Sequence, residues 1–287
     1  MAAKEEKKAL GISYFSNTKC HCPVCKKEFP KEVMRSGNGR MIAGALTDEL
    51  HRIFEPSAKF GMVYPLIYDV GVCPNCYTAF FWNDFNGKFD KDITDKLYET
   101  YRSRKESVEN IFPYFNLKKE RSLYDGCAIY MLALMTYDHL PKDFVPTLKQ
   151  AMLSLRLAWL TEDLHKEVPG HNFDLVSKMF YSKALFFYQQ SIVNEPVEKS
   201  SSLNYMGPDM DKNYGWDGVV YLSGLLEYKY GQQNDQQLRL QKLSESKTAI
   251  ARIFGLGKSS KNKPGPLLEH ARNLYDQLSK LIKDEDF

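Results

Sequence analysis

The segment that begins with Cys22-Pro23-Val24-Cys25 and ends with Cys73-Pro74-Asn75-Cys76 decides the fold of this 287-residue chain. A Cys-x-x-Cys turn places two sulfur atoms at one edge of a tetrahedron, so two such turns complete a tetrahedral metal site. The turn also points backbone N–H groups at the sulfurs, which favours the thiolate form that binds metal. The sequence therefore predicts a structural Zn²⁺ site whose ligands are Cys22, Cys25, Cys73 and Cys76.

The residues after the two motifs bear on which metal binds. Glycine is common there, because a positive φ lets the backbone N–H face the sulfur, but this chain has Lys26 and Tyr77. Left-handed geometry at these residues costs about 1–2 kcal/mol, which is small beside a structural zinc binding energy of about 10–16 kcal/mol. Zinc is favoured over a rubredoxin-type iron centre, which would use the same cysteines but gain from the glycines. Four cysteines close the coordination shell, so the ion is expected to stabilise folding rather than to catalyse.

The two other cysteines and the N-terminus are less informative. Cys127 lies in an apolar helical pattern and is expected to be a small core residue. Cys20 is expected to be a spare thiol beside the site, with a replacement ligand or a redox-sensitive neighbour as alternatives. The charged stretch 1–10 has no apolar run behind it, and no segment looks able to span a bilayer. The sequence therefore predicts a cytoplasmic protein, in which metal ligation is favoured over disulfides.

The stretch between the two motifs is too long for a minimal zinc ribbon, so it must have structure of its own. Residues 26–29 predict a strand that returns from the first motif with Phe29 over the site, and Ser36-Gly37-Asn38-Gly39 predicts a turn between two extended pieces. Residues 48–54 predict one or two helical turns, and residues 61–72 predict a strand leading into the second motif. We expect a flexible tail over 1–13 and a zinc-ribbon-like α+β module over 14–92.

From residue 93 to the C-terminus the apolar residues follow helical spacing. Helices are expected over 93–112, from 123 to before Pro141, from Pro146 to before Pro169, over 176–195, over 216–230, over 236–254 and over 267–281. The fourth of these helices, 176–195, is expected to end at Pro196. The fold class is therefore mainly α, with residues 93–287 as a tetratricopeptide-like (TPR-like) bundle or solenoid of antiparallel helix pairs. The run 221–228 matches the first helix of such a repeat, with small residues where the helices would cross.

These residues resemble a known group. The motif Cys22–Cys25 followed by Glu28-Phe29, then Tyr64–Val70 running into Cys73–Cys76 and Ala79, is similar to bacterial domain of unknown function family 2225. The resemblance continues through Leu155–Leu160, Tyr221–Leu225 and Ala271-Arg272. It implies a zinc-ribbon-like front followed by TPR-like helices, and it implies no activity.

The sequence contains partial matches to enzymatic motifs, but each lacks a residue or setting that the motif requires. Gly257-Lys258-Ser259 resembles the end of a phosphate-binding loop, but the required earlier glycine is replaced by Arg252. His165 and His171 flank a turn and are expected on the surface, and Glu162-Asp163 is expected to be a solvated helix end. No side-chain pair has the sequence surroundings that a catalytic dyad needs, so the sequence predicts a protein that is not an enzyme.

The favoured function is a protein–protein interaction adaptor whose helical groove binds a protein partner. Tyr181, Tyr188, Tyr214 and Tyr228 are possible anchors and equally possible core residues. The alternative is a nucleic-acid-binding zinc-ribbon protein, supported by two basic clusters: Lys26, Lys27 and Lys31, and Lys247, Arg252, Lys258, Lys261 and Lys263. The formal net charge of only +3 favours solvated basic faces instead. A third possibility is a redox sensor in which Cys20 and the first motif release zinc on oxidation.

Overall fold

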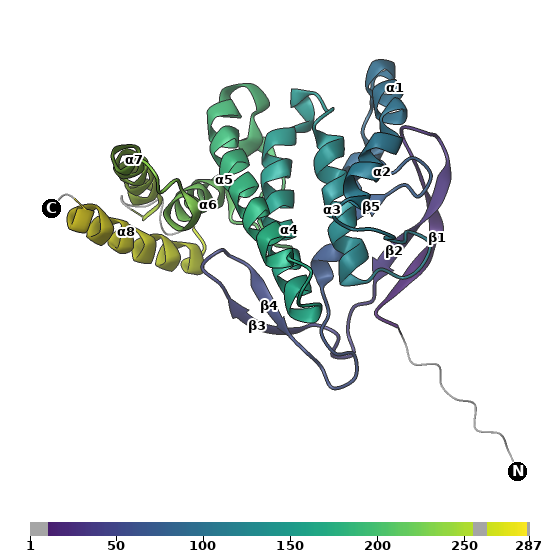
Figure 1. Ribbon diagram of the computed structural model, residues 1–287, viewed down its shortest axis with the longest axis horizontal. Helices are drawn as coiled ribbons and strands as arrows, with labels where there is room; N and C mark the ends of the chain where they lie inside the picture. The colour runs from purple at the N-terminus through teal and green to yellow at the C-terminus, as the bar shows by residue number, and fades with distance from the viewer. Residues whose placement is uncertain (1–10, 255–262, 286–287) are drawn as a thin grey trace, which may run out of the picture.

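The computed structural model describes residues 11–254 and 263–285, and within them the fold is mainly helical with a small N-terminal region of short antiparallel strands (Figure 1). This confirms the coarse fold class. The described strands form three hairpins: β1 (Ser13–His21) with β2 (Glu28–Met34), β3 (Ile42–Leu46) with β4 (Arg52–Glu55), and β5 (Val70–Val72) with β6 (Ala79–Phe81). Of the predicted tail, residues 1–10 lie outside the described residues, and Ser13 already belongs to β1.

The helices follow the predicted order with shifted bounds. They are the 3₁₀ helices η1 (Pro65–Tyr68), η2 (Trp82–Asn86), η3 (Lys142–Phe144) and η4 (Ser200–Ser202), and the α-helices α1 (Lys91–Glu99), α2 (Tyr101–Glu109), α3 (Leu123–Tyr137), α4 (Pro146–Glu167), α5 (Phe173–Glu198), α6 (Gly215–Tyr230), α7 (Gln236–Phe254) and α8 (Gly265–Glu285). The single helix predicted over 93–112 is wrong, because the chain breaks at Thr100 into α1 and α2. Pro196 does not end α5, which runs to Glu198. A proline this close to a helix end removes only one backbone hydrogen bond, to the carbonyl of the partly exposed Ile192.

The hairpins β1–β2 and β5–β6 carry the two cysteine motifs in their turns. Phe29 of β2 is buried, as predicted. The strand predicted over 61–72 is wrong, because only Val70–Val72 is extended and Pro65–Tyr68 forms η1 with all four residues buried. Proline lacks the N–H that a strand ladder requires and has the φ of a helical first turn. Packing of η1 against α3 therefore outweighs the β-branched pattern.

The hairpin β3–β4 replaces the helical turns predicted over 48–54, which is a further error. Residues 48–50 form the turn, and Leu50 is fully buried at a φ of 59°. The turn lies beneath the helices (Figure 1): the Tyr221 hydroxyl of α6 donates to the Asp48 carbonyl at 2.8 Å, and Trp159 Nε1 of α4 donates to Glu49 at 2.5 Å. The segment between the two motifs therefore reaches across the helical body rather than enlarging the metal-site hairpins.

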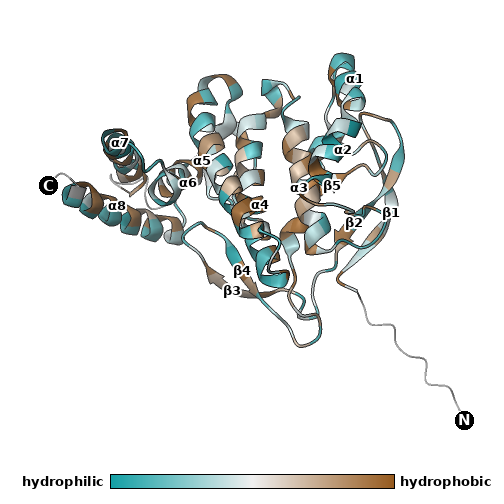
Figure 2. Ribbon diagram, in the orientation of Figure 1, coloured by the Kyte–Doolittle hydropathy of each residue, from teal (hydrophilic) through white to brown (hydrophobic). Residues whose placement is uncertain are grey.

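Helices α3, α4 and α5 lie side by side, with α6, α7 and α8 at one end of the molecule and β1, β2, α1 and α2 at the other (Figure 1). Figure 2 shows hydrophobic residues concentrated on α3 and the neighbouring α4, and every residue of Gln150–Thr161 is buried. At the crossing of α6 and α7, a Cβ on Gly224 would lie 3.1 Å from Cδ1 of Ile250. The small residue therefore allows this close approach.

The buried apolar residues form one continuous cluster from Cys22 to Leu278, which includes the three buried motif cysteines Cys22, Cys73 and Cys76. Among the described residues, no helix combines the length and the hydrophobicity needed to cross a bilayer. The boundary between residues 92 and 93 stays a prediction.

Replacing Gly126 with alanine is expected to destabilise the protein by about 1–3 kcal/mol. A Cβ at Gly126 of α3 would lie 2.4 Å from Cγ2 and 2.6 Å from Cβ of Ile67 in η1, so η1 would have to move. In an open helix the same change stabilises by roughly 1 kcal/mol. Urea unfolding measures the difference, and Gly265→Ala, where a Cβ has no described neighbour within 4 Å, is the control. Equal or higher stability of Gly126→Ala would contradict the close packing of η1 on α3.

Candidate metal centre

The two Cys-Pro-x-Cys motifs fold into equivalent turns. In the first, the Cys22 N–H donates to the Lys27 carbonyl at 3.0 Å and the Lys26 N–H donates to the Cys22 carbonyl at 3.0 Å. In the second, the Cys73 N–H donates to the Thr78 carbonyl at 2.9 Å and the Tyr77 N–H donates to the Cys73 carbonyl at 2.9 Å. Lys26 has a φ of 61° and Tyr77 a φ of 54°, so the left-handed geometry expected at these two non-glycine residues is confirmed.

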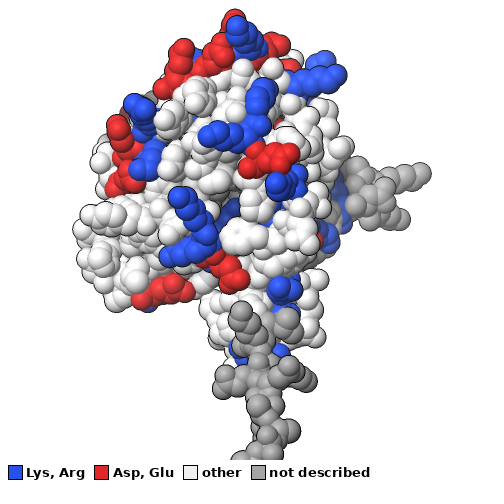
Figure 3. All heavy atoms as spheres, turned by 90° about the vertical axis from the view of Figure 1, so that its right-hand side faces the viewer, with Lys and Arg blue, Asp and Glu red and all other residues white. Residues whose placement is uncertain are grey.

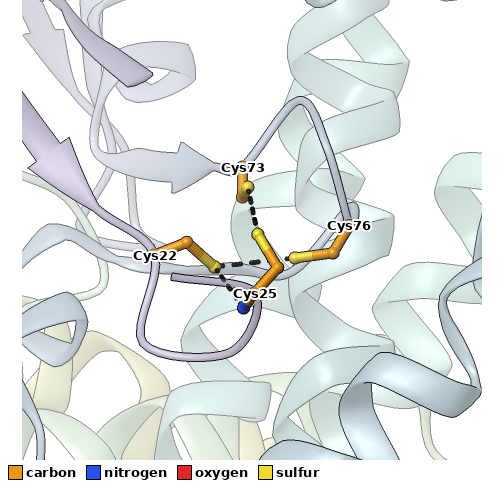
Figure 4. Close-up of side chains that lie close together, drawn as sticks. All are labelled: Cys22, Cys25, Cys73 and Cys76. Carbon is orange, nitrogen blue, oxygen red and sulfur yellow. Dashed lines mark hydrogen bonds between the residues drawn. The ribbon is translucent and has the colours of Figure 1, made fainter. Parts of the chain in front are cut away.

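The turns bring the four predicted sulfur atoms together (Figure 4). The Sγ atoms all lie within 4.8 Å of one another, with Cys22 and Cys76 at 3.5 Å and Cys25 and Cys73 at 3.6 Å. Disulfide sulfurs would be about 2.05 Å apart, whereas tetrahedral sulfurs bonded at about 2.3 Å to a central ion lie about 3.8 Å apart. The group is therefore spaced for a tetrahedral ion and could hold a metal, with two ligands from each hairpin.

Neighbouring polar groups are aimed at these sulfurs. The Cys25 backbone N–H donates to Cys22 Sγ at 3.5 Å, and the buried Thr78 hydroxyl lies 3.2 Å from Cys76 Sγ. Hydrogen bonds of this kind stabilise thiolates and orient ligands around an ion.

A buried guanidinium fastens α2 to the second turn. Arg104 is 2% exposed, and its Nη2 donates to the Cys76 carbonyl at 3.2 Å while its Nη1 donates to the Leu97 carbonyl at 2.9 Å. Burial lowers the pKa of Arg104, and the charge of Cys76 opposes that change. Four thiolates around a divalent ion carry a net negative charge, so the charge of Arg104 offsets part of it.

The crowding of the sulfurs separates their pKa values. The pKa of Cys22 is raised because its thiol donates to Cys73 and Cys76 and because the side chain is buried. The pKa of Cys76 is lowered because its sulfur accepts hydrogen bonds from Cys22, Cys73 and Thr78. The cluster without a cation therefore keeps protons on some of its sulfurs at neutral pH, and a metal must displace them.

Metal affinity is expected to fall as the pH falls. If two or more protons leave on binding, the apparent affinity changes by roughly 100-fold or more per pH unit near and below neutrality. Affinity falls with falling pH because the raised pKa of Cys22 favours its protonated thiol, which does not bind metal. Competition with a chromophoric chelator at several pH values measures the slope, and calorimetry in two buffers counts the released protons. An affinity independent of pH would contradict thiolate ligation by these residues.

The remaining cysteines lie outside the cluster. Cys20 is half-buried in β1 opposite Phe29 and does not belong to the four-sulfur group. Burial raises the pKa of Cys20, so a smaller fraction of this residue is in the reactive thiolate form at neutral pH. Cys127 is fully buried in α3, as expected of a core residue.

Sequence reasoning missed a histidine–aspartate pair beneath the helices. His51 Nδ1 lies 2.5 Å from Asp209 Oδ2, and the imidazole stacks on Trp159 with ring centroids 4.1 Å apart. Burial alone would raise the pKa of Asp209, but hydrogen bonds from His51 and from the backbone N–H groups of Arg52 and Met210 lower it. Asp209 is thus a fixed carboxylate, and Nε2 of His51 has no hydrogen-bond partner among the described residues.

A buried carboxylate lies next to this pair. Glu49 is 6% exposed and accepts hydrogen bonds from Trp159 Nε1 at 2.5 Å, from the Tyr181 hydroxyl at 3.2 Å and from Lys229 Nζ at 2.9 Å. It therefore joins the β3–β4 turn to α4, α5 and α6. The stretch Asp48-Glu49-Leu50-His51 is a polar turn in sequence, and its partners lie more than one hundred residues away, so no local signal reveals it.

We call the opening beside His51, between β3–β4 and α4–α5, the hairpin cleft. It consists of two cavities of about 190 and 270 Å³ that share five lining residues: His51, Ile53, Trp159, Asp163 and Lys166. The smaller cavity is lined by four carboxylates, Asp48, Glu49, Glu162 and Asp163. Lys229 pairs with the first two and Lys166 with the last two, so acidic groups outnumber these lysines by four to two. The larger is lined mainly by apolar ones, from Phe54 and Met62–Leu66. An acidic end and an apolar end therefore adjoin.

A larger cavity of about 500 Å³ lies between η2, α4 and residues 203–210. Two ion pairs line it, Lys149 with Asp84 at 2.7 Å and Arg156 with Asp69 at 2.5 Å. Its acidic and basic groups are thus already paired within the protein.

The tyrosines, histidines and other residues singled out in the sequence differ in their exposure to solvent. Tyr181, Tyr188 and Tyr214 are buried core residues, and Tyr228 is half-buried. His171 is exposed as expected, but His165 is half-buried. Glu162 is exposed, and Gly257-Lys258-Ser259 lies outside the described residues.

A family model described as "Uncharacterized protein conserved in bacteria (DUF2225)" matches residues 15–278. A protein of Borreliella burgdorferi described as "Uncharacterized protein" is 43% identical over 282 residues, which cover 95% of this chain and 98% of that relative. No solved structure matches the chain.

Proposed function

This chain belongs to the DUF2225 family of bacterial proteins, and from that starting point we propose that it is a non-enzymatic, cytoplasmic zinc protein that serves as a protein–protein interaction adaptor. The observation that carries the proposal is the meeting of four cysteine sulfurs from two equivalent hairpin turns. Zinc suits them because a tetrahedral shell of four thiolates is its preferred structural site. Such a closed shell offers no open position for a substrate, which supports a structural role for the ion.

The partner-binding part of the proposal rests on the hairpin cleft. At its acidic end, four carboxylates are paired with only two lysines, and this excess of negative charge would attract a basic side chain. Its adjoining apolar end would bury an aliphatic or aromatic side chain. We infer that the partner presents a basic residue next to an apolar residue in an extended peptide or a helix turn. The hydrogen bonds of Glu49 and Asp209 hold the cleft walls in place before binding, which reduces the entropy cost of association.

Peptide binding tests this proposal. Fluorescence anisotropy would compare a labelled peptide rich in lysine and leucine with the same peptide carrying glutamate in place of lysine. Reversing the charge at the rim, Asp163→Lys, is expected to weaken binding of the lysine peptide at least tenfold, or about 1.4 kcal/mol. Glu106→Lys, an exposed charge reversal on α2, is the matched control and should bind as wild type. Equal binding of both peptides, or none, would contradict the role proposed for the cleft.

Nucleic-acid binding receives less support. Lys263 pairs with Asp217 at 2.9 Å, and Lys247 lies over the Tyr275 ring at 5.3 Å, while Lys258 and Lys261 lie outside the described residues. On the face that carries β1 and β2, basic and acidic residues are intermixed (Figure 3). Tight, strongly salt-dependent binding of random-sequence RNA or DNA would favour this alternative over the adaptor.

We also propose that α3 to α8 form TPR-like helix pairs. Support comes from the strong packing of consecutive helices, above all α4 on α5 and α7 on α8, and from Gly224 at the crossing of α6 and α7. Superposing an experimental structure on TPR repeats would test the assignment.

A further inference from the structure

Helix α5 has an apolar stripe that no other described element covers. Its residues are Leu175, Met179, Phe186, Val193 and Val197, with exposed fractions from 40% for Met179 to 69% for Val193. One more large apolar residue of the helix, Ile192, is 36% exposed but lies about 120° away from the direction of Phe186. At about 100° per residue these side chains fall within about 20° of the direction of Phe186. The buried face of the same helix, which includes Ser177, Ala184, Tyr188 and Ser191, points the opposite way into the core. α5 is therefore apolar on both faces, and one face lacks a partner in the single chain.

The residues of this stripe are placed symmetrically in sequence about Phe186. Leu175 and Val197 each lie eleven residues from Phe186, and Met179 and Val193 each lie seven residues from it. Ser182 and Gln190, four residues away on either side, complete the pattern at the edges of the stripe. Two copies of a helix that pack antiparallel about a two-fold axis require such symmetric placement. Across the axis, residue i of one copy contacts residue j of the other, and residue j contacts residue i.

The lysines that flank the stripe also distinguish an antiparallel pair from a parallel one. In an antiparallel pair centred on Phe186, Lys178 lies opposite Asn194, and Lys183 lies opposite Gln189. In a parallel pair each lysine would lie beside its own copy, which is unfavourable. The flanking residues thus favour the antiparallel arrangement.

We propose that α5 is the contact surface of a homodimer, in which two α5 helices pack antiparallel about a two-fold axis at Phe186. Leu175 of each chain then packs near Val197 of the other, and Met179 near Val193. The stripe is about 33 Å long and about 10 Å wide, which is smaller than the standard interface of about 800 Å² per partner. The dimer is therefore weak, and it forms in the micromolar range of protein concentration.

Sedimentation velocity of the full chain over a concentration series tests the dimer. Phe186→Glu is expected to weaken dimerisation at least about 100-fold, because the residue contributes twice at the axis. Its side chain is 55% exposed, so the variant should fold, and circular dichroism checks this. Tyr114→Glu replaces an aromatic residue that is 94% exposed outside the stripe, and it should dimerise as wild type.

Photo-crosslinking determines the orientation. Leu175→benzoylphenylalanine should crosslink to the region around Val197 of a second chain, as identified by mass spectrometry. Crosslinks to the region around Leu175 would indicate a parallel pair and overturn the proposal. A wild type that stays monomeric at all concentrations, or a dimer that survives Phe186→Glu, would overturn it as well.

Discussion

Cys73→Ser is expected to abolish metal binding and to unfold the strands that carry the two motifs. Serine supplies no thiolate, so the ion would lose one of its two ligands from the β5–β6 turn. Because β5 and β6 are only three residues long each, they depend on the ion and on packing against α3. Structural zinc supplies an apparent binding free energy of about 10–16 kcal/mol in small domains. Loss of even part of this free energy exceeds what the three-residue strands β5 and β6 can compensate.

Hydrogen exchange measures this effect. Amides of β1, β2, β5 and β6 should exchange faster in Cys73→Ser, while the core of α4 should keep its protection. Cys20→Ser is the matched control, because that thiol is two residues from Cys22 but outside the four-sulfur group. If Cys73→Ser retains the metal and the exchange pattern of the wild type, the four sulfurs do not form the site.

Arg156→Met is expected to destabilise the protein by about 1–3 kcal/mol, the usual cost of leaving a buried hydrogen-bond acceptor without its donor. The cost stays below that of breaking a fully buried ion pair, because the Asp69 side chain is 31% exposed. Arg156 is fully buried in α4, and it donates to Asp69 Oδ2 at 2.5 Å and to the Pro208 carbonyl at 2.6 Å. It thus joins the segment before the second cysteine motif to the loop before α6. Methionine fills much of the volume but leaves the Asp69 carboxylate and the Pro208 carbonyl without this donor.

Urea unfolding of Arg156→Met, Asp69→Asn and the double variant separates the contributions. The two single changes should be non-additive, with a coupling energy of about 0.5–3 kcal/mol. Arg102→Met removes an exposed arginine from α2 and should change the stability by less than about 0.5 kcal/mol. Additive effects would show that Arg156 acts by packing alone.

The sequence was sufficient to predict the two cysteine turns, because each turn depends on neighbouring residues. Each Cys-Pro-x-Cys motif determines its own turn, and the left-handed residues Lys26 and Tyr77 follow from turn geometry. The order of the long helices was also predictable, since the helical spacing of their apolar residues repeats over many residues. The strand predicted over 61–72 failed because burial of η1 against α3 is a tertiary interaction that outweighs β-propensity.

The hairpin cleft, unlike the cysteine turns, depends on contacts between residues far apart in the sequence. His51 and Asp209 are 158 residues apart, and Glu49 reaches partners on three helices. The side chains in this cluster are ordinary polar residues of a turn and a loop when taken one at a time. Only the folded chain brings them together, so motif reasoning on one sequence could not identify them.

Zinc K-edge X-ray absorption on the purified protein, combined with elemental analysis, tests the central claim most directly. We expect one zinc per chain, with four sulfur neighbours at about 2.3 Å, and no metal in Cys73→Ser. Iron in place of zinc, nitrogen or oxygen neighbours in the first shell, or a folded wild-type protein without any metal would contradict it.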